Sequence, residues 1–139
     1  MLVDKIILPQ ELLTKLIAHA KKSSPNESVS MISGSIKDGI AYAEKVYTPD
    51  NIDKSTTTFT VDPLTLLEIY TEIEEEERIL VAIYHTHPAP PQPSGTDRHY
   101  MEVNLCVWLI SSTKKPEEPK GFLLEQNGNL KEIDISILN

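Results

Sequence analysis

The sequence predicts an α/β sandwich, in which helices lie on both sides of one mixed sheet. Helix-like and strand-like segments alternate along the chain, and this order favours a sheet with helices packed against it. Residues 79–87 begin as a continuous apolar run of strand length, the pattern of a strand covered on both faces. The length of 139 residues and the 40% hydrophobic content are ordinary for one soluble globular domain. We therefore expect residues 1–139 to form a single domain.

The first third of the chain predicts a helix followed by a hairpin. Pro9–Lys22 places leucine, isoleucine and alanine at intervals of three and four residues, with proline in the first turn, which is typical of an amphipathic helix. Ser23–Asn26 is rich in turn-forming residues and ends it. Ser28–Ile36 and Ile40–Tyr47 then predict two strands, because the Asp38-Gly39 pair between them favours a hairpin turn.

The middle of the chain predicts two strands, a helix and a rigid loop. Thr56–Val61 is β-branched enough to predict a strand. Asp62-Pro63 is a typical start for the helix that we expect to run past Ile73, and Ile79–His87 is the expected central strand. Four prolines lie within Pro88–Pro93, where the missing N–H groups exclude both helix and sheet pairing.

The last third predicts a short helix and three strands. The helix spans Thr96 to about Val103, and the strands are expected at Leu105–Ser112, Gly121–Gln126 and Leu130–Ile135. An Asn-Gly pair joins the last two strands, which again favours a hairpin.

Charge and composition narrow the classes of partner. The chain has 13 basic and 21 acidic residues, a formal net charge of −8. Such an acidic protein repels phosphate backbones and anionic lipids, so we expect neither nucleic acid nor membrane as a partner. The longest apolar stretch, Leu105–Ile110, is far shorter than the roughly 18 residues of a membrane span. Residues 1–5 carry no secretory signal and the single cysteine, Cys106, cannot form an intramolecular disulfide, so we expect a cytoplasmic protein.

Two histidines and one aspartate are the strongest candidates for chemistry. His85 and His87 lie two apart at the end of the central strand, so their side chains point to the same face. Asp97 follows ten residues later, at the start of the next helix. Two imidazoles and one carboxylate are suitable ligands for Zn²⁺, and they leave the fourth tetrahedral position free for water, as in catalytic zinc sites.

Each part of this pattern also has a purely structural interpretation. Histidines at strand ends often form hydrogen bonds in loops, and Ser94 with Asp97 has the spacing of a helix capping box. The combination favours the metal site, because two strand-end histidines, a rigid turn and a returning carboxylate occur together.

These motifs resemble those of the JAMM (MPN-domain) zinc metalloenzymes, which include compact archaeal and bacterial members. The matching segments are His85-Thr86-His87-Pro88, Ser94-Gly95-Thr96-Asp97 and the segment from Glu27 to Gly34. Phe59–Pro63 is also similar to the family, whereas Pro88–Pro93 is one residue shorter than the usual loop. The resemblance implies a cytidine-deaminase-like α-β-α sandwich around one mixed β-sheet.

The resemblance also assigns roles to five side chains. It implies that His85, His87 and Asp97 bind one Zn²⁺ per chain, that Glu27 is the general acid/base, and that Ser94 donates a hydrogen bond to the developing oxyanion. The other interpretations are a solvent-exposed carboxylate for Glu27 and a helix cap for Ser94.

The implied function is a zinc-dependent hydrolase that cleaves peptide or isopeptide bonds at the C-terminus of ubiquitin-like proteins. A ubiquitin-like protein or its conjugate is therefore the expected substrate, and a homo-oligomer or a larger complex is compatible with the family. One alternative is a peptidase that processes sulfur-carrier proteins, and another is a metal-free MPN scaffold that organises a complex. A two-histidine, one-carboxylate iron oxygenase is a third alternative, although the helices that flank the motif disfavour it.

Overall fold

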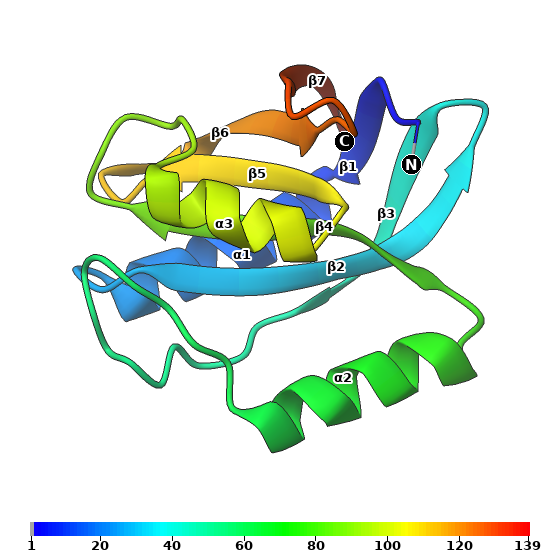
Figure 1. Ribbon diagram of the computed structural model, residues 1–139. Coiled ribbons are helices and arrows are strands. Elements are labelled where there is room, and N and C mark those ends of the chain that lie inside the picture. Colours follow the sequence, from blue (N-terminus) through cyan, green and yellow to red (C-terminus); the bar gives the residue numbers. More distant parts are fainter. Residues whose placement is uncertain (1) are drawn as a thin grey trace.

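The computed structural model describes residues 2–139, which form one mixed sheet with three helices (Figure 1). The strands are β1 (Lys5–Pro9), β2 (Ser28–Lys37), β3 (Ile40–Tyr47), β4 (Ile79–His87), β5 (Val107–Ser112), β6 (Lys115–Leu124) and β7 (Leu130–Leu138). The helices are α1 (Gln10–Ser23), α2 (Pro63–Glu75) and α3 (Gly95–Val103). The predicted α/β class with a single mixed sheet is therefore confirmed.

The sheet closes into a barrel, and this differs from the predicted α-β-α sandwich. The strand order is β1-β3-β2-β4-β5-β6-β7, and β1 pairs in parallel with both β3 and β7. β1, which joins the two sheet edges at Lys5–Pro9, is not among the strands that the sequence predicts. Because β1 satisfies the backbone groups of both neighbouring strands, the described sheet has no open edge between them.

The two faces of β4 and β5 carry different helices. Tyr84 and Leu109 lie in a buried cluster with the apolar side of α1, whereas Ile83 and Trp108 lie in a second cluster with Met101 of α3. Alternating side chains of one strand point to opposite faces, so β4 is buried on both sides as its apolar run predicted. This central position fixes the strand that ends in the two candidate histidines.

The predicted strand at Thr56–Val61 is wrong, because this segment lies in an irregular loop. We call residues 48–62 the Asn51 loop. The N–H groups of Thr57 and Thr58 donate to the Ser55 hydroxyl, at 3.0 and 3.2 Å, and the N–H of Thr60 donates to the Asn51 side chain at 3.1 Å. These side-chain acceptors replace strand pairing, and such local competition overrides the β propensity of threonine.

The strand at the C-terminal side also begins earlier than predicted. β6 starts at Lys115 rather than at Gly121, and it contains Pro116 and Pro119. Its pairing with β7 covers only residues 121–124, so the prolines lie outside that ladder and their missing N–H groups leave no gap there. Among residues 2–139, no helix is long and apolar enough to cross a membrane.

Gly34 is expected to be the glycine least tolerant of substitution in the barrel. It lies in β2 at a register shift opposite β3, where an added Cβ would stand 1.8 Å from the carbonyl oxygen of Tyr42. We expect Gly34→Ala to lower the free energy of unfolding by about 2–3 kcal/mol, because backbone on both sides must shift. Urea denaturation followed by circular dichroism measures this change.

Gly95→Ala is the matched control, since an added Cβ at Gly95 meets no atom within 4 Å. Equal stability of the two alanine variants would contradict the close approach at Gly34.

Candidate metal centre

Two neighbouring segments bring the candidate ligands together. His85 and His87 end β4 on one face of the strand, and Asp97 lies in the first turn of α3. Ser94 is the N-cap of α3: its Oγ accepts a hydrogen bond from the Asp97 N–H at 3.0 Å, and its own N–H donates to Asp97 Oδ2 at 2.9 Å. This capping box holds the Asp97 carboxylate toward the strand, and it confirms the interpretation of Ser94 as a helix cap.

The three candidate ligands lie within coordination range of one another. His85 Nε2 is 2.9 Å from Asp97 Oδ1, and His87 Nε2 is 3.3 Å from Asp97 Oδ2. All three residues are buried, and one ligand atom from each lies within 4.8 Å of the others. Ligand atoms around a tetrahedral Zn²⁺ stand about 3.3 Å apart, given metal–ligand distances of about 2.0–2.1 Å. The spacing is therefore compatible with a metal ion.

The surroundings of His85 point to a cation more directly. Its Nδ1 lies 3.2 Å from the Ser28 carbonyl oxygen and donates to it, which leaves Nε2 with a lone pair in the neutral ring. Among residues 2–139, no hydrogen bond satisfies Nε2, although the carboxylates of Asp97 and Glu27 lie 2.9 and 3.4 Å away. A buried lone pair that faces two carboxylates is unfavourable alone and fits a bound cation.

His87 is held on the opposite side of the carboxylate. Its Nε2 lies 3.1 Å from the carbonyl oxygen of Gln92 in the proline-rich loop. The hydrogen bond with Asp97 raises the pKa of His87 more than its burial lowers it. Burial alone raises the pKa of Asp97, but the neighbouring His85 and His87 rings outweigh it and hold the pKa below the usual range. Asp97 is thus ionised, as a metal ligand must be.

Glu27 is buried beside these residues and is not the solvent-exposed carboxylate of the alternative interpretation. It precedes β2 and is 5% exposed, with Oε1 3.4 Å from His85 Nε2. Burial is the main cause that raises its pKa above the usual value. A raised pKa makes a carboxylate a stronger proton acceptor than an ordinary glutamate, which suits a general acid/base.

Two residues near the site have no role that the sequence predicts. Phe59 packs its ring against that of His85, with centroids 4.7 Å apart, and so covers the histidine from the Asn51 loop. Asn51 is buried and binds the main chain of Glu27. The Asn-Ile-Asp segment is an available signal for Asn51, since asparagine often caps its own loop, whereas Phe59 was assigned to a strand.

The proline-rich loop brings α3 back to the end of β4 although it is one residue shorter than is usual in the family. Pro88–Pro93 returns the chain from β4 to α3, and Asp97 Oδ1 then lies 2.9 Å from His85 Nε2. Ser94 is exposed, and its Oγ uses a lone pair for the Asp97 N–H, so its hydroxyl proton remains free to donate.

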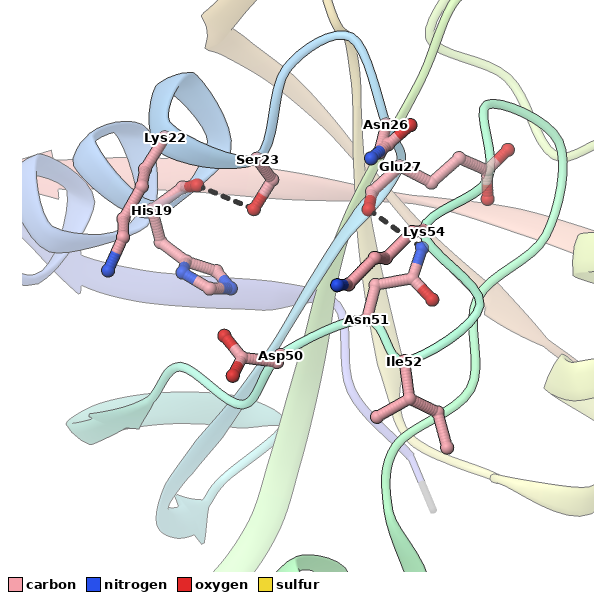
Figure 2. Close-up of a pocket in the computed structure, with 9 residues that line it drawn as sticks. All are labelled: His19, Lys22, Ser23, Asn26, Glu27, Asp50, Asn51, Ile52 and Lys54. Carbon is pink, nitrogen blue, oxygen red and sulfur yellow. Dashed lines mark hydrogen bonds between the residues drawn. The ribbon is translucent and has the colours of Figure 1, made fainter.

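Two cavities flank the Asn51 loop. A polar cavity of about 400 Å³ lies beside α1 (Figure 2) and an apolar cavity of about 210 Å³ lies beside α2. The polar cavity is lined by His19, Lys22, Ser23, Asn26, Glu27, Asp50, Asn51, Ile52 and Lys54. The apolar cavity is lined by Val29, Met31, Phe59, Thr60, Val61, Leu66, Tyr70, Ile83, Tyr100, Asn104 and Trp108. Phe59 therefore separates the apolar cavity from His85.

The chain is similar to several prokaryotic peptidases. A desampylase from Pyrococcus furiosus is 35% identical over 80 residues, 57% of this chain and 56% of that protein, so the match spans little more than half of that relative. A CysO-cysteine peptidase from Mycobacterium tuberculosis is 25% identical over 112 residues, 80% of this chain and 75% of that protein. A probable TtuB-protein conjugate cleaving protease from Thermus thermophilus is 34% identical over 94 residues, 66% of this chain and 60% of that protein.

One solved structure has a similar fold, and one family description matches most of the chain. The solution structure of a protein from Desulfitobacterium hafniense has a TM-score of 0.82 and 28% identity, and the match covers 96% of this chain and 93% of that one. The description "Prokaryotic homologs of the JAB domain" matches residues 9–124, which include the candidate site from Glu27 to Asp97. The predicted resemblance is confirmed: this chain belongs to the prokaryotic JAB family, the compact form of the JAMM/MPN domain.

Proposed function

We propose that this protein is a zinc-dependent hydrolase that cleaves peptide or isopeptide bonds at the C-terminus of ubiquitin-like proteins. The observation that carries the proposal is the buried cluster of His85, His87 and Asp97, with the Glu27 carboxylate 3.4 Å from an unsatisfied nitrogen of His85. Three ligands and an adjacent proton carrier are the parts that metal-assisted hydrolysis requires. We propose that they work within a single cytoplasmic domain.

The names of the relatives support a substrate of this kind. One relative is named for cleaving conjugates between TtuB and protein, one is named a CysO-cysteine peptidase, and one is named a desampylase. The CysO-cysteine peptidase favours the second candidate function, the processing of a sulfur-carrier protein, in which the leaving group is small. Both candidates use the same site and the same bond chemistry.

The residues divide the work of amide hydrolysis. His85, His87 and Asp97 would hold the zinc ion, which when bound lowers the pKa of a water molecule and polarises a carbonyl. Glu27 accepts the proton of the attacking water and delivers it to the leaving nitrogen. Ser94 donates a hydrogen bond from its free hydroxyl group to the developing oxyanion. Phe59 covers His85 and limits the access of bulk water to it.

The first test is metal content. We expect the purified protein to bind about one zinc per chain, because three buried ligands form a complete set for an open zinc site. Elemental analysis of protein purified without chelator measures this. His99→Ala is the matched control: His99 is exposed and lies outside the ligand cluster, so this variant should keep its zinc. Absence of zinc before and after titration would favour the scaffold, and stoichiometric iron would favour an oxygenase.

The second test is the substrate. The wild-type protein is incubated with a panel of ubiquitin-like proteins that carry C-terminal extensions or isopeptide-linked lysine, with and without chelator. We expect release of the free C-terminus in at least one case and loss of release with chelator. Cleavage that persists without metal, or no cleavage by zinc-loaded protein across the panel, would contradict the proposal.

A further inference from the structure

The Asn51 side chain joins four backbone groups at the candidate site. Its Nδ2 donates to the carbonyl oxygens of Glu27 and Thr58, at 3.0 Å each. Its Oδ1 accepts from the N–H groups of Asp53 and Thr60, at 3.1 Å each. The residue is 8% exposed, so both donors and the acceptor of a buried amide are used.

These bonds tie the proposed proton carrier to the loop whose Phe59 ring packs against His85. Figure 2 shows the Asn51 amide directed at the main-chain carbonyl of Glu27. The N–H of Glu27 donates to the Ser55 carbonyl at 2.8 Å, so the Asn51 loop holds the main chain of Glu27 at both of its polar groups. Phe59, which packs against His85, lies in sequence between Thr58 and Thr60. Both of these threonines form main-chain hydrogen bonds with the Asn51 side chain.

We propose that Asn51 is a positioning residue for Glu27, setting the main chain from which the carboxylate reaches the metal centre. The inference rests on the proposed function, in which Glu27 carries the proton. A glutamate side chain has several rotatable bonds, and here only the fixed main chain and the buried surroundings keep its Oε1 3.4 Å from His85 Nε2. A misplacement of about 1 Å costs up to roughly 10²-fold in rate.

Because of the polar cavity, a substitution of Asn51 can disturb the position of Glu27 without unfolding the protein. It borders Asn51 and Glu27 on the α1 side and has a volume of about 400 Å³, which is room for water. If the Asn51 amide is removed, water in this space can pair with the freed backbone groups, so the fold keeps most of its stability. Water does not fix a main chain as a rigid side-chain amide does, and the carboxylate then loses its defined position.

The kinetic test compares Asn51→Ala with Asp53→Ala. The Asp53 carboxylate accepts from the Thr60 hydroxyl at 2.9 Å within the same loop, but it does not touch Glu27. On a cleaved substrate, we expect Asn51→Ala to lower kcat by about 10²-fold with KM changed less than about threefold and zinc content unchanged. Asp53→Ala should stay within about threefold of wild type in kcat. Equal losses in both variants would overturn the proposal.

A double variant separates positioning from general damage. If Asn51 acts through Glu27, its substitution has little left to disturb once the carboxylate is gone. Glu27→Gln/Asn51→Ala should therefore be no more than about twofold slower than Glu27→Gln alone. A further loss of about 10²-fold in the double variant would show that Asn51 acts by another route.

Amide hydrogen exchange gives a readout that does not depend on activity. We expect Asn51→Ala to speed exchange of the Glu27 amide by at least about tenfold, while the amides of β4 in this variant exchange as in wild type. In Asp53→Ala, the Glu27 amide should exchange at the wild-type rate. Unchanged exchange at Glu27 would overturn the inference. The exchange measurement tests the positioning role of Asn51 even if the wild-type protein cleaves no substrate. A lack of cleavage would count against the proposed function alone. If Asn51→Ala does not fold, Asn51→Asp serves instead, because it keeps the acceptor contacts to Asp53 and Thr60 and loses the Nδ2 donor that binds the carbonyl oxygens of Glu27 and Thr58.

Discussion

Glu27→Gln is expected to lower kcat by roughly 10²–10⁴-fold while zinc content and substrate affinity stay close to wild type. Glutamine has nearly the same size and can still form hydrogen bonds in the buried position, but it can neither accept the proton of the attacking water nor deliver it to the leaving nitrogen. Steady-state kinetics on one substrate, together with elemental analysis, separate binding from catalysis. Near-normal turnover would show that another group carries the proton.

Ser94→Ala on the same substrate ranks the two proposed roles. We expect a smaller loss than for Glu27→Gln, because an oxyanion donor is one of several groups that stabilise the developing charge. The substitution also removes the acceptor for the Asp97 N–H, so zinc content must be measured alongside. A larger loss than for Glu27→Gln, with zinc retained, would reverse the assigned order of importance.

The second large effect concerns the ligands. His87→Ala and Asp97→Ala are each expected to abolish metal binding and activity, because either change leaves two ligands in place of three. The fold should persist, since a chain of this size buries enough surface to be stable without a metal. Circular dichroism and elemental analysis are the measurements. A variant unfolded at moderate temperature would instead indicate a structural metal.

The clustering of the candidate ligands could be predicted because it follows from short-range patterns. His85 and His87 alternate on one strand, and the spacing from Ser94 to Asp97 is a local capping box, so each pair requires only the geometry of its own element. Glu27 was found through the family motif and not from its surroundings. Its burial depends on contacts with a loop that is distant in sequence, which periodicity does not reveal.

The parts that were missed depend on long-range pairing or on side-chain competition. β1 has only five residues, and α1 follows it directly in the sequence with no turn between them. Nothing in its local pattern indicates that it pairs with β7. The Thr56–Val61 segment has strand propensity, but hydrogen bonds to the Asn51 and Ser55 side chains take its backbone groups. Phe59 was therefore placed in a sheet and not over His85.

The pairing of β1 with β7 also has a consequence for the order of folding. Ile6 lies beside Ile135, so the contact that closes the barrel joins residues near opposite ends of the described chain. Such contacts raise the relative contact order and slow folding, because most of the entropy of loop closure is lost before the contact forms. During synthesis, β1 cannot pair with β7 until β7 has left the ribosome. Until then, one of its two edges stays unpaired and open to intermolecular strand pairing.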